Sequence, residues 1–353
     1  MTDISKWATW REIQSQPDIW EAWWPELEAL LPEIKSWIAG LDITEVWFSG
    51  AGTSAYIGDF IAAGLNAQSP IPLRSVASTD LVAAPHQFLG SARPLVVNFG
   101  RSGDSAESIG VLDVLDAMAP DAPRLNITCN PRGTLATRNK TNQLVINLPE
   151  ATHDEGFAMT SSYSTMLLTA LAIFDHDMPA QAFSELAEAT RQALPGFTKL
   201  GAEMEMPSRM VITGSGVLRF TAREAALKIM ELAAGQIPSI WDSSLGFRHG
   251  PKSFVSHYTH VLILKSADPD IARYDLDLAT ELREQFQYIT VTIVEPSGLR
   301  DVWGGVMQAI TCQVIATILS HRLEQNVDNP FEGQGTLSRV VSGVTIYPPK
   351  ARP

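Results

Sequence analysis

The sequence predicts an α/β protein built on parallel sheets. From residue 44 onward, short β-branched and apolar runs alternate with helix-like stretches, as in strands connected by crossover helices. Two of these runs, VWFSGAG and MVITGSG, end in the same turn pattern, [ST]-G-[AS]-G, and their glycines Gly50 and Gly214 lie 164 residues apart. Ser102 and Ser266 each follow these glycines by 52 residues, so we expect an internal duplication.

The first 40 residues predict a helical N-terminal arm. Six of the nine tryptophans fall there, in stretches with helical spacing such as IWEAWWPELEALLPEI. So aromatic a segment would form a sticky surface if it were exposed. We therefore expect the arm, residues 1–40, to pack on the main body or on a second subunit.

Two domains follow the arm. The runs EVWFS, LRSVAS, PLVVNF, RLNITC and QLVINL predict the strands of the first domain, with helices on both faces of its sheet. Residues 176–208 are typical of a linking helix with prolines, and the strand pattern restarts after them. We expect the first domain to span 41–195 and the second 208–353, with a boundary near 195 to 208.

Composition narrows the classes of partner. The 353 residues are 45% hydrophobic and carry a net charge of −13, which argues against nucleic acids and acidic membranes because both bind basic surfaces. Only Cys129 and Cys312 are present, so neither a disulfide framework nor a cysteine-rich metal site is indicated, and a reducing cytoplasm fits. The start shows no targeting signal, and the apolar stretch around 166–174 is too short to span a bilayer.

The stretch GRSGDSAES, residues 100–108, is the first candidate binding site. Its serines recur three residues apart, and its glycines allow a tight turn whose N–H groups point at one spot. A helix that begins at its end would favour an anion, and phosphate is the natural ligand. An ordinary capped helix start is the alternative interpretation.

A second hydroxyl-bearing turn, with Gly52, Thr53 and Ser54, can face the first one across the carboxyl end of a parallel sheet. Its letters also fit the dinucleotide pattern G-x-G-x-x-A. The acidic residue that this pattern requires after the next strand is missing, because Arg74 and hydroxyls stand there and Asp80 comes too late. We therefore do not expect a nicotinamide cofactor.

The second half carries titratable residues instead. Glu224, Lys228 and Glu231 are spaced four and three residues apart, so they share one face of a helix. A solvated charge ladder is the alternative interpretation, but this helix follows the glycine-rich turn at 214–216 and its first turns border the predicted cleft. Downstream, GFRHGPKS places His249 in a loop framed by glycine and proline, and no strong metal-binding spacing is present.

Together these motifs resemble the sugar isomerase (SIS) family, with two SIS domains in tandem, and in particular its AgaS-type members of amino-sugar catabolism. The resemblance rests on SGAGTSAYIGDF, STDLV, FGRSGDSAES, ITCN, THDEGFAMTSS, AREAALKIMELAAG, LGFRHGPKS, YDLDLATELR and GTLSRVVSGVTIYP, which run in order from about residue 46 to 348. It implies that each domain is a flavodoxin-like, three-layer αβα sandwich around a parallel sheet.

The same resemblance implies a galactosamine-6-phosphate deaminase/isomerase that forms tagatose 6-phosphate and ammonia. The sugar ring opens, C2 loses a proton and C1 gains one, which requires a carboxylate base and an anchored phosphate but no cofactor. A 2-amino sugar then yields a 2-imine that water hydrolyses. The implied partners are a sugar phosphate and a second copy of the chain.

Roles for individual residues follow from the related isomerase domain of glucosamine-6-phosphate synthase. Glu231 matches its catalytic base, Lys228 a group that polarises the sugar oxygens, and His249 a ring-opening histidine supplied by the neighbouring subunit. An active site shared in this way implies a homodimer or larger homo-oligomer. Resemblance also assigns substrate binding to several residues: Arg101, Ser102 and Ser105 as phosphate anchors with Thr53 and Ser54 nearby, Glu155 and Thr160 at the sugar hydroxyls, and Arg339 in place of a substrate-covering lysine.

Three other functions remain as alternatives. A plain aldose–ketose isomerase would act on another sugar with an anionic group at C6, and a glucosamine-6-phosphate deaminase would prefer the other C4 epimer. A sugar-phosphate sensor is the third, since SIS domains also serve as ligand-binding modules. The joint presence of Lys228, Glu231 and His249 favours catalysis over sensing.

Overall fold

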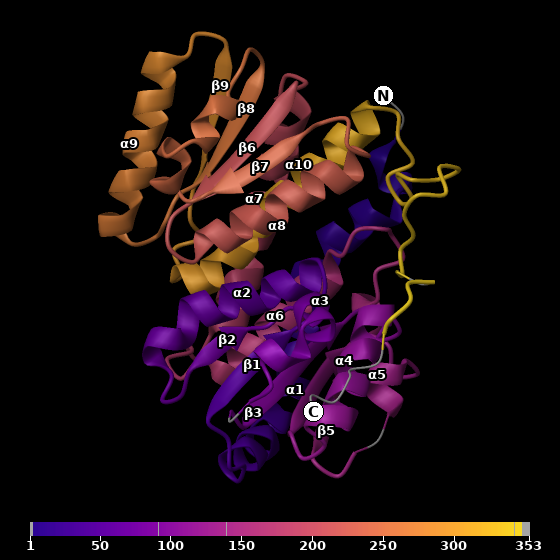
Figure 1. The fold of residues 1–353 in the computed structure, drawn as a ribbon. Helices are drawn as coiled ribbons and strands as arrows, with labels where there is room; N and C mark the ends of the chain where they lie inside the picture. Colours follow the sequence, from indigo (N-terminus) through magenta and orange to yellow (C-terminus); the bar gives the residue numbers. More distant parts are fainter. Residues whose placement is uncertain (1–2, 91, 139, 342, 348–353) are drawn as a thin grey trace. The chain divides into compact units, whose positions relative to one another are not determined.

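A computed structural model describes residues 3–90, 92–138, 140–341 and 343–347 (Figure 1). The first sheet has five parallel strands in the order β2-β1-β3-β4-β5. They are β1 (Glu45–Ser49), β2 (Leu73–Ser75), β3 (Pro94–Gly100), β4 (Arg124–Thr128) and β5 (Gln143–Asn147). The strand order 2-1-3-4-5 is that of flavodoxin-like folds, which confirms the predicted α/β class.

Helices cover both faces of the first sheet. They are α2 (Thr53–Leu65), α3 (Ser78–Ala83), α4 (Ala106–Met118), α5 (Thr134–Thr137) and α6 (Ser161–Phe174). On one face Trp47 of β1 belongs to a buried cluster with Leu81 of α3 and Val111 of α4. On the other face the neighbouring Phe48 meets Phe174 of α6 edge to face at 5.2 Å. Alternation along one strand therefore builds a three-layer sandwich.

The second sheet repeats this plan with one strand fewer. Its parallel strands β6 (Arg209–Gly214), β7 (Ser239–Asp242), β8 (Thr259–Leu264) and β9 (Ile289–Val294) lie in the order β7-β6-β8-β9. Figure 1 shows α9 (Pro269–Gln285) on one face and α8 (Leu218–Leu232) and α10 (Asp301–Arg322) on the other. The order matches the first sheet without its fifth strand, as the predicted duplication requires.

The N-terminal arm is helical, as predicted, because α1 runs from Ala8 to Ala39. Its beginning is fixed to the second-sheet part of the chain: Asp328 accepts hydrogen bonds from the backbone N–H groups of Ala8 and Thr9, at 2.9 and 2.8 Å. Further along, the indole N–H of Trp23 donates to Thr169 of α6 at 2.9 Å. Trp20 and Trp23 of the arm are buried within the chain itself.

Backbone contacts divide the chain into two compact units that exchange segments. The first-sheet unit comprises Glu21–Asp154, Ser161–Met178 and Leu337–Pro353, and the second-sheet unit comprises Met1–Trp20, Glu155–Thr160 and Pro179–Thr336. These units differ from the predicted domains, since the C-terminal tail groups with the first sheet and α7 (Ala182–Glu203) with the second. The tail does so because its backbone bonds to the loop after β3. The ends of the predicted arm and second domain, residues 1–2 and 348–353, lie outside the described residues.

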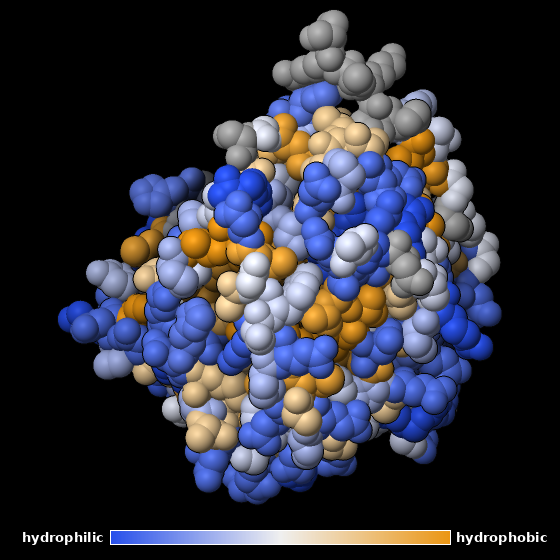
Figure 2. All heavy atoms as spheres, turned by 90° about the horizontal axis from the view of Figure 1, so that it is seen from below, coloured by the Kyte–Doolittle hydropathy of each residue, from blue (hydrophilic) through white to orange (hydrophobic). Residues whose placement is uncertain are grey.

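Helix α10 is the most apolar long element. By length and composition it could cross a membrane, and it is longer than the apolar stretch at 166–174 singled out from the sequence. Its most apolar window is completely buried in the fold, so it serves as a core helix. The face drawn in Figure 2, by contrast, is largely hydrophilic with separate apolar areas.

Short 3₁₀ helices complete the chain. They lie at Ile4–Lys6, Asn66–Gln68, Pro85–Gln87, Glu150–Thr152, Gly246–Arg248 and Pro251–Phe254. The last two flank His249, so the segment that carries this histidine has defined secondary structure on both sides.

Candidate functional site

The loop GRSGDSAES leaves β3 at Gly100 and enters α4 at Ala106. Side chains from neighbouring strand ends hold it in place: Asp104 accepts hydrogen bonds from Thr134, and Asn130 donates to the Ser102 carbonyl at 2.9 Å. Gly103 has φ +69°, and a Cβ there would lie 3.0 Å from the side chain of Leu135. The turn therefore requires a residue without a side chain at this position.

Two hydrogen-bond donors of this loop remain available. The Ser102 hydroxyl accepts from the Asp104 N–H at 3.2 Å, but its own proton has no acceptor among the described residues. Likewise, the Gly103 N–H bonds to none of the residues that the structure describes. Ser105 instead caps α4 and bonds to Ser108, so the capped helix start is present, and the anion site stays a prediction.

The second hydroxyl-bearing turn lies beside this loop. Strands β1 and β3 are neighbours that pair in parallel, so both turns leave the same edge of the sheet. Gly52 takes φ +55°, and Thr53 and Ser54 are buried in the first turn of α2. Because α2 and α4 cover opposite faces, this edge is the topological switch point at which ligands of such folds bind.

The C-terminal tail lies over the loop. Arg101 is buried and its guanidinium donates to the Arg339 carbonyl at 3.0 Å. The Ala106 N–H donates to the Val341 carbonyl at 3.3 Å. Arg101, Ser102, Ser105 and Arg339, which the sequence assigns to one site, thus lie close together.

The cations of this cluster influence nearby titratable groups. Burial, followed by the charges of Arg339 and Arg101, lowers the pKa of His153. Cys129 is close enough for both arginines to act on it, but burial dominates and raises its pKa to about 12. Burial likewise raises the pKa of Cys312 to about 12. Neither thiol is therefore a nucleophile at neutral pH.

Glu155 and Thr160 stand at the two ends of one segment of the second-sheet unit. Glu155 is exposed and its backbone N–H donates to Glu12 at 2.6 Å, whereas Thr160 is fully buried. Sequence reasoning assigned no role to Asp154, which is buried and accepts from the N–H groups of Ser161 and Ser162. It caps the first turn of α6 from seven residues before the helix begins, so no local N-cap pattern marks it in the sequence.

In the second-sheet unit, α8 carries three charged side chains. The Lys228 ammonium is fully buried and lies 2.5 Å from Glu231 and 3.4 Å from Glu224. Glu224 is also buried, while the side chain of Glu231 is 23% exposed. The solvated charge ladder is therefore wrong: helical spacing brings the three groups together, but the body of the protein covers two of them.

The electrostatics of this trio are set by opposing effects. Burial disfavours the charge of Lys228, but the carboxylates of Glu224 and Glu231 outweigh it and raise the pKa of the lysine. An ammonium that stays charged fixes one oxygen of Glu231, the exposed member. A carboxylate held in this way can take a proton from a bound molecule and return it to a neighbouring carbon.

His249 lies in the same unit on a different segment. Its backbone N–H donates to the Gly246 carbonyl at 2.8 Å, and the residue is exposed. No described residue forms a side-chain hydrogen bond or ion pair with its imidazole. The structure thus brings Lys228 and Glu231 together, but it does not join His249 to them.

The counterpart of the phosphate loop in the second sheet is closed. Ser266 accepts from the Asp268 N–H at 3.0 Å, as Ser102 does from that of Asp104, but the Ser266 hydroxyl donates to Asp301. The Ala267 N–H, at the position equivalent to Gly103, donates to Asp301 at 2.7 Å. Sequence reasoning missed this carboxylate, which lies 35 residues further along the chain than Ser266.

A metal site is not formed by the residues that the structure describes. Among them, no group of three or more His, Cys, Asp and Glu is placed to hold an ion. Among the described residues, the loop after β3 offers hydroxyls, backbone N–H groups and arginines, and α8 carries the carboxylate–lysine trio.

Comparisons with known proteins agree with these features. The chain is 37% identical to a D-galactosamine-6-phosphate deaminase AgaS of Shewanella sp. (strain ANA-3), over 99% of this chain and 94% of that one. It is 36% identical to a protein of the same name from Escherichia coli, over 97% of this chain and 96% of the relative. No family model matches the chain.

A solved structure shows the same fold. The crystal structure of tagatose-6-phosphate ketose/aldose isomerase from Escherichia coli has a TM-score of 0.89 and 32% sequence identity, and the match covers 99% of both chains. The tandem arrangement predicted from the sequence motifs is thereby confirmed as the architecture of this chain.

Proposed function

Because this chain belongs to the family of D-galactosamine-6-phosphate deaminases, AgaS, we propose that it converts galactosamine 6-phosphate to tagatose 6-phosphate and ammonia. The observation that carries this proposal is the partly exposed carboxylate of Glu231 held by the buried ammonium of Lys228. It is an enzyme and not a sensor, since its relatives are named as deaminases and isomerases.

Glu231 is the base. After the ring opens, its carboxylate removes the proton from C2, which leaves an enolamine between C1 and C2. The same carboxylate returns the proton to C1 and so forms a 2-imine. Water then adds at C2, and ammonia leaves as the ketose forms. Lys228 acts through Glu231, because both carboxylates of the trio already engage its ammonium.

The 6-phosphate is held by the loop after β3. Ser102 and Gly103 offer a hydroxyl proton and an N–H that the described residues do not use. These donors are supplemented by the hydroxyls of Thr53, Ser54 and Ser105 and by the cation of Arg339. Arg101 keeps the C-terminal tail in place through its hydrogen bond to the Arg339 carbonyl. We further assign Gly52 to the turn that brings the substrate close to the backbone, and Glu155 and Thr160 to the sugar hydroxyls.

The test is ammonia release, coupled to glutamate dehydrogenase, with galactosamine 6-phosphate and glucosamine 6-phosphate offered side by side. We expect release from the galacto sugar. Release only from the gluco sugar would make the chain a glucosamine-6-phosphate deaminase.

A plain isomerase is the second candidate, because a similar solved structure is named a ketose/aldose isomerase. The same proton transfer on a 2-hydroxy sugar would stop at the ketose. Failure to release ammonia from either amino sugar, together with interconversion of tagatose 6-phosphate and its aldose, would establish this function instead.

We also propose that His249 opens the ring in a neighbouring subunit. Support comes from its exposure and from the exposed Trp241 and Leu245 on the same segment. Mixing two inactive variants, Glu231→Gln and His249→Ala, tests this. In an equimolar mixture of dimers with shared sites, half of all dimers would be mixed, and each mixed dimer would contain one intact site out of two, so about a quarter of wild-type activity should return. A mixture that stays inactive after subunit exchange would place both groups in one chain.

The enzyme works in the cytoplasm. Support for this location comes from its two cysteines, which are free and buried. It needs no cofactor for the reaction above, because every step is a proton transfer or a hydrolysis.

A further inference from the structure

The motif YDLDLATELR, residues 274–283, has no role in the reaction described above. It lies on α9, which packs on the face of the second sheet that also buries Phe247. Two of its acidic residues, Asp275 and Glu281, contact the segment that carries His249. This motif therefore connects to the catalytic segment through specific bonds.

Asp275 fixes the beginning of the segment. It is completely buried, and one carboxylate oxygen accepts from the hydroxyls of Ser215 at 2.6 Å and Ser244 at 2.5 Å. The other oxygen accepts from the Ser266 N–H at 3.0 Å. Asp275 thus ties together the turns that leave β6, β7 and β8.

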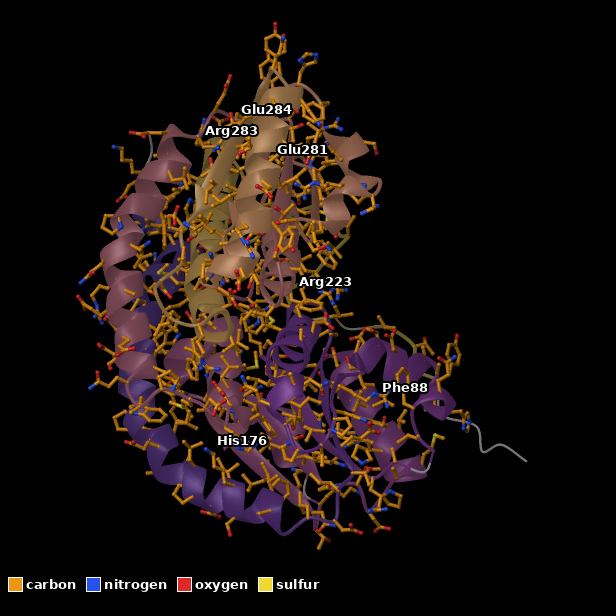
Figure 3. The ribbon with its side chains drawn as sticks, turned by 90° about the vertical axis from the view of Figure 1, so that its left-hand side faces the viewer. Phe88, His176, Arg223, Glu281, Arg283 and Glu284 are labelled. Carbon is orange, nitrogen blue, oxygen red and sulfur yellow. The ribbon has the colours of Figure 1, made fainter. Side chains whose placement is uncertain are left out.

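Glu281 fixes the segment on both sides of His249. One carboxylate oxygen accepts from Arg248 Nε at 2.6 Å, and the other pairs with Lys252 Nζ. Arg248 also donates to the Ser244 carbonyl at 2.9 Å. Glu281 lies in the last turns of α9, as Figure 3 shows together with Arg283 and Glu284.

These bonds also explain the two cations beside His249. In the sequence, Arg248 and Lys252 could form an anion site. In the structure Glu281 forms an ion pair with each of them, and their hydrogen bonds lower the pKa of this carboxyl, so the ion pairs persist at neutral pH. Their role is therefore to attach the segment to α9.

Within the segment 246–254, His249 is the exposed residue with a titratable side chain, and Gly250 and Ser253 are exposed with it. Phe247 is buried against Leu278 and Leu282 of α9, and residues 248 and 252 are bonded to Glu281. Gly250, with φ +127°, allows the chain to turn directly after His249. We propose that Glu281 is a positioning residue, which holds the segment 246–254 so that His249 is presented for ring opening; this inference rests on the proposed function.

The first measurement is hydrogen–deuterium exchange of the full chain, followed in peptides that cover 246–254. Glu281→Gln keeps the shape but loses the charge, so we expect faster exchange there. Glu284→Gln is the matched control, because it makes the same change on the same helix at an exposed residue, and exchange should stay as in the wild type. Unchanged exchange in Glu281→Gln would overturn the inference even if the wild type releases no ammonia.

Kinetics give the second measurement. We expect Glu281→Gln to lower kcat about 10-fold with KM within about twofold, since small misplacement of a catalytic group is costly. In a His249→Ala background the same change should have no further effect, because both act on one step. An equal loss in both backgrounds would contradict a role through His249. If Glu281→Gln does not fold, Lys252→Met breaks the same ion pair and carries the same expectations.

Discussion

The loop after β3 in the first sheet and the loop after β8 in the second sheet have the same backbone pattern but different hydrogen-bond acceptors. After β3, the hydroxyl of Ser102 and the N–H of Gly103 have no acceptor among the described residues. After β8, the equivalent Ser266 and Ala267 both donate to Asp301. In both copies this turn brings hydrogen-bond donors together, and the copies differ in the acceptor. In one copy the chain supplies a carboxylate, and in the other we propose that the substrate supplies a phosphate.

In the second-sheet unit the loop after β8 has its donors bonded within the chain, and the charged groups proposed for catalysis lie elsewhere. The second-sheet unit places its buried charges on α8, where Lys228 holds Glu231. We therefore expect changes in the first loop to affect substrate affinity, and changes on α8 to affect turnover.

The largest effect is expected from Glu231→Gln. The amide cannot accept the C2 proton, so kcat should fall about 10²- to 10⁴-fold. Substrate binding, measured by calorimetry, should stay near the wild-type value because the phosphate loop is untouched. Wild-type turnover in this variant would contradict the expectation that changes on α8 affect turnover and changes in the first loop affect affinity.

A smaller effect is expected from Ser102→Ala. Loss of one hydrogen bond to a charged phosphate should weaken substrate binding by about 1–3 kcal/mol and raise KM accordingly. Inorganic phosphate should become a weaker competitor in the same assay.

Ser266→Ala is the matched change in the closed loop. It removes the bond to Asp301, so thermal unfolding should show a loss of about 1–2 kcal/mol, while KM stays unchanged. Equal effects of the two alanine substitutions on substrate affinity would show that the loops are not functionally different.

The smallest effect concerns pH. Burial raises the pKa of Asp301 in the folded chain, against hydrogen bonds that lower it. The folded state thus binds the Asp301 proton more tightly than the unfolded state does. This proton binding stabilises the folded state at low pH, and the stabilisation is lost as pH rises from the usual carboxyl pKa through the raised one. Asp301→Asn should lack this pH dependence. As pH rises through that window, the free energy of unfolding of the wild type should therefore fall relative to that of the variant. A constant difference in chemical denaturation would contradict the assignment.

Much of the fold was predictable because its signals are local. The glycines Gly50 and Gly214 recur at fixed spacing, and each close turn excludes a side chain: a Cβ on Gly50 would lie 2.6 Å from Ser54. Helical spacing likewise put Glu224, Lys228 and Glu231 on one face before their contacts were visible. Patterns of this kind survive in the sequence because neighbouring residues create them.

Long-range contacts left no such pattern. Arg101 meets the tail at Arg339, 238 residues away, and the tail groups with the first sheet against expectation. Asp301 begins α10, where an acidic residue is ordinary, so nothing marked it as the partner of Ser266. The sequence motif around His249 was enough to single out the histidine, but it did not predict the contacts between this segment and α9.

The two inert thiols have a practical consequence. With a pKa of about 12, only about one Cys129 or Cys312 side chain in 10⁵ is ionised at neutral pH, and both are buried. Maleimide reagents should therefore leave the native chain almost unmodified. A single cysteine introduced at exposed Glu284 would then carry a fluorophore on the helix whose Glu281 pairs with Arg248 and Lys252, without any prior removal of natural cysteines.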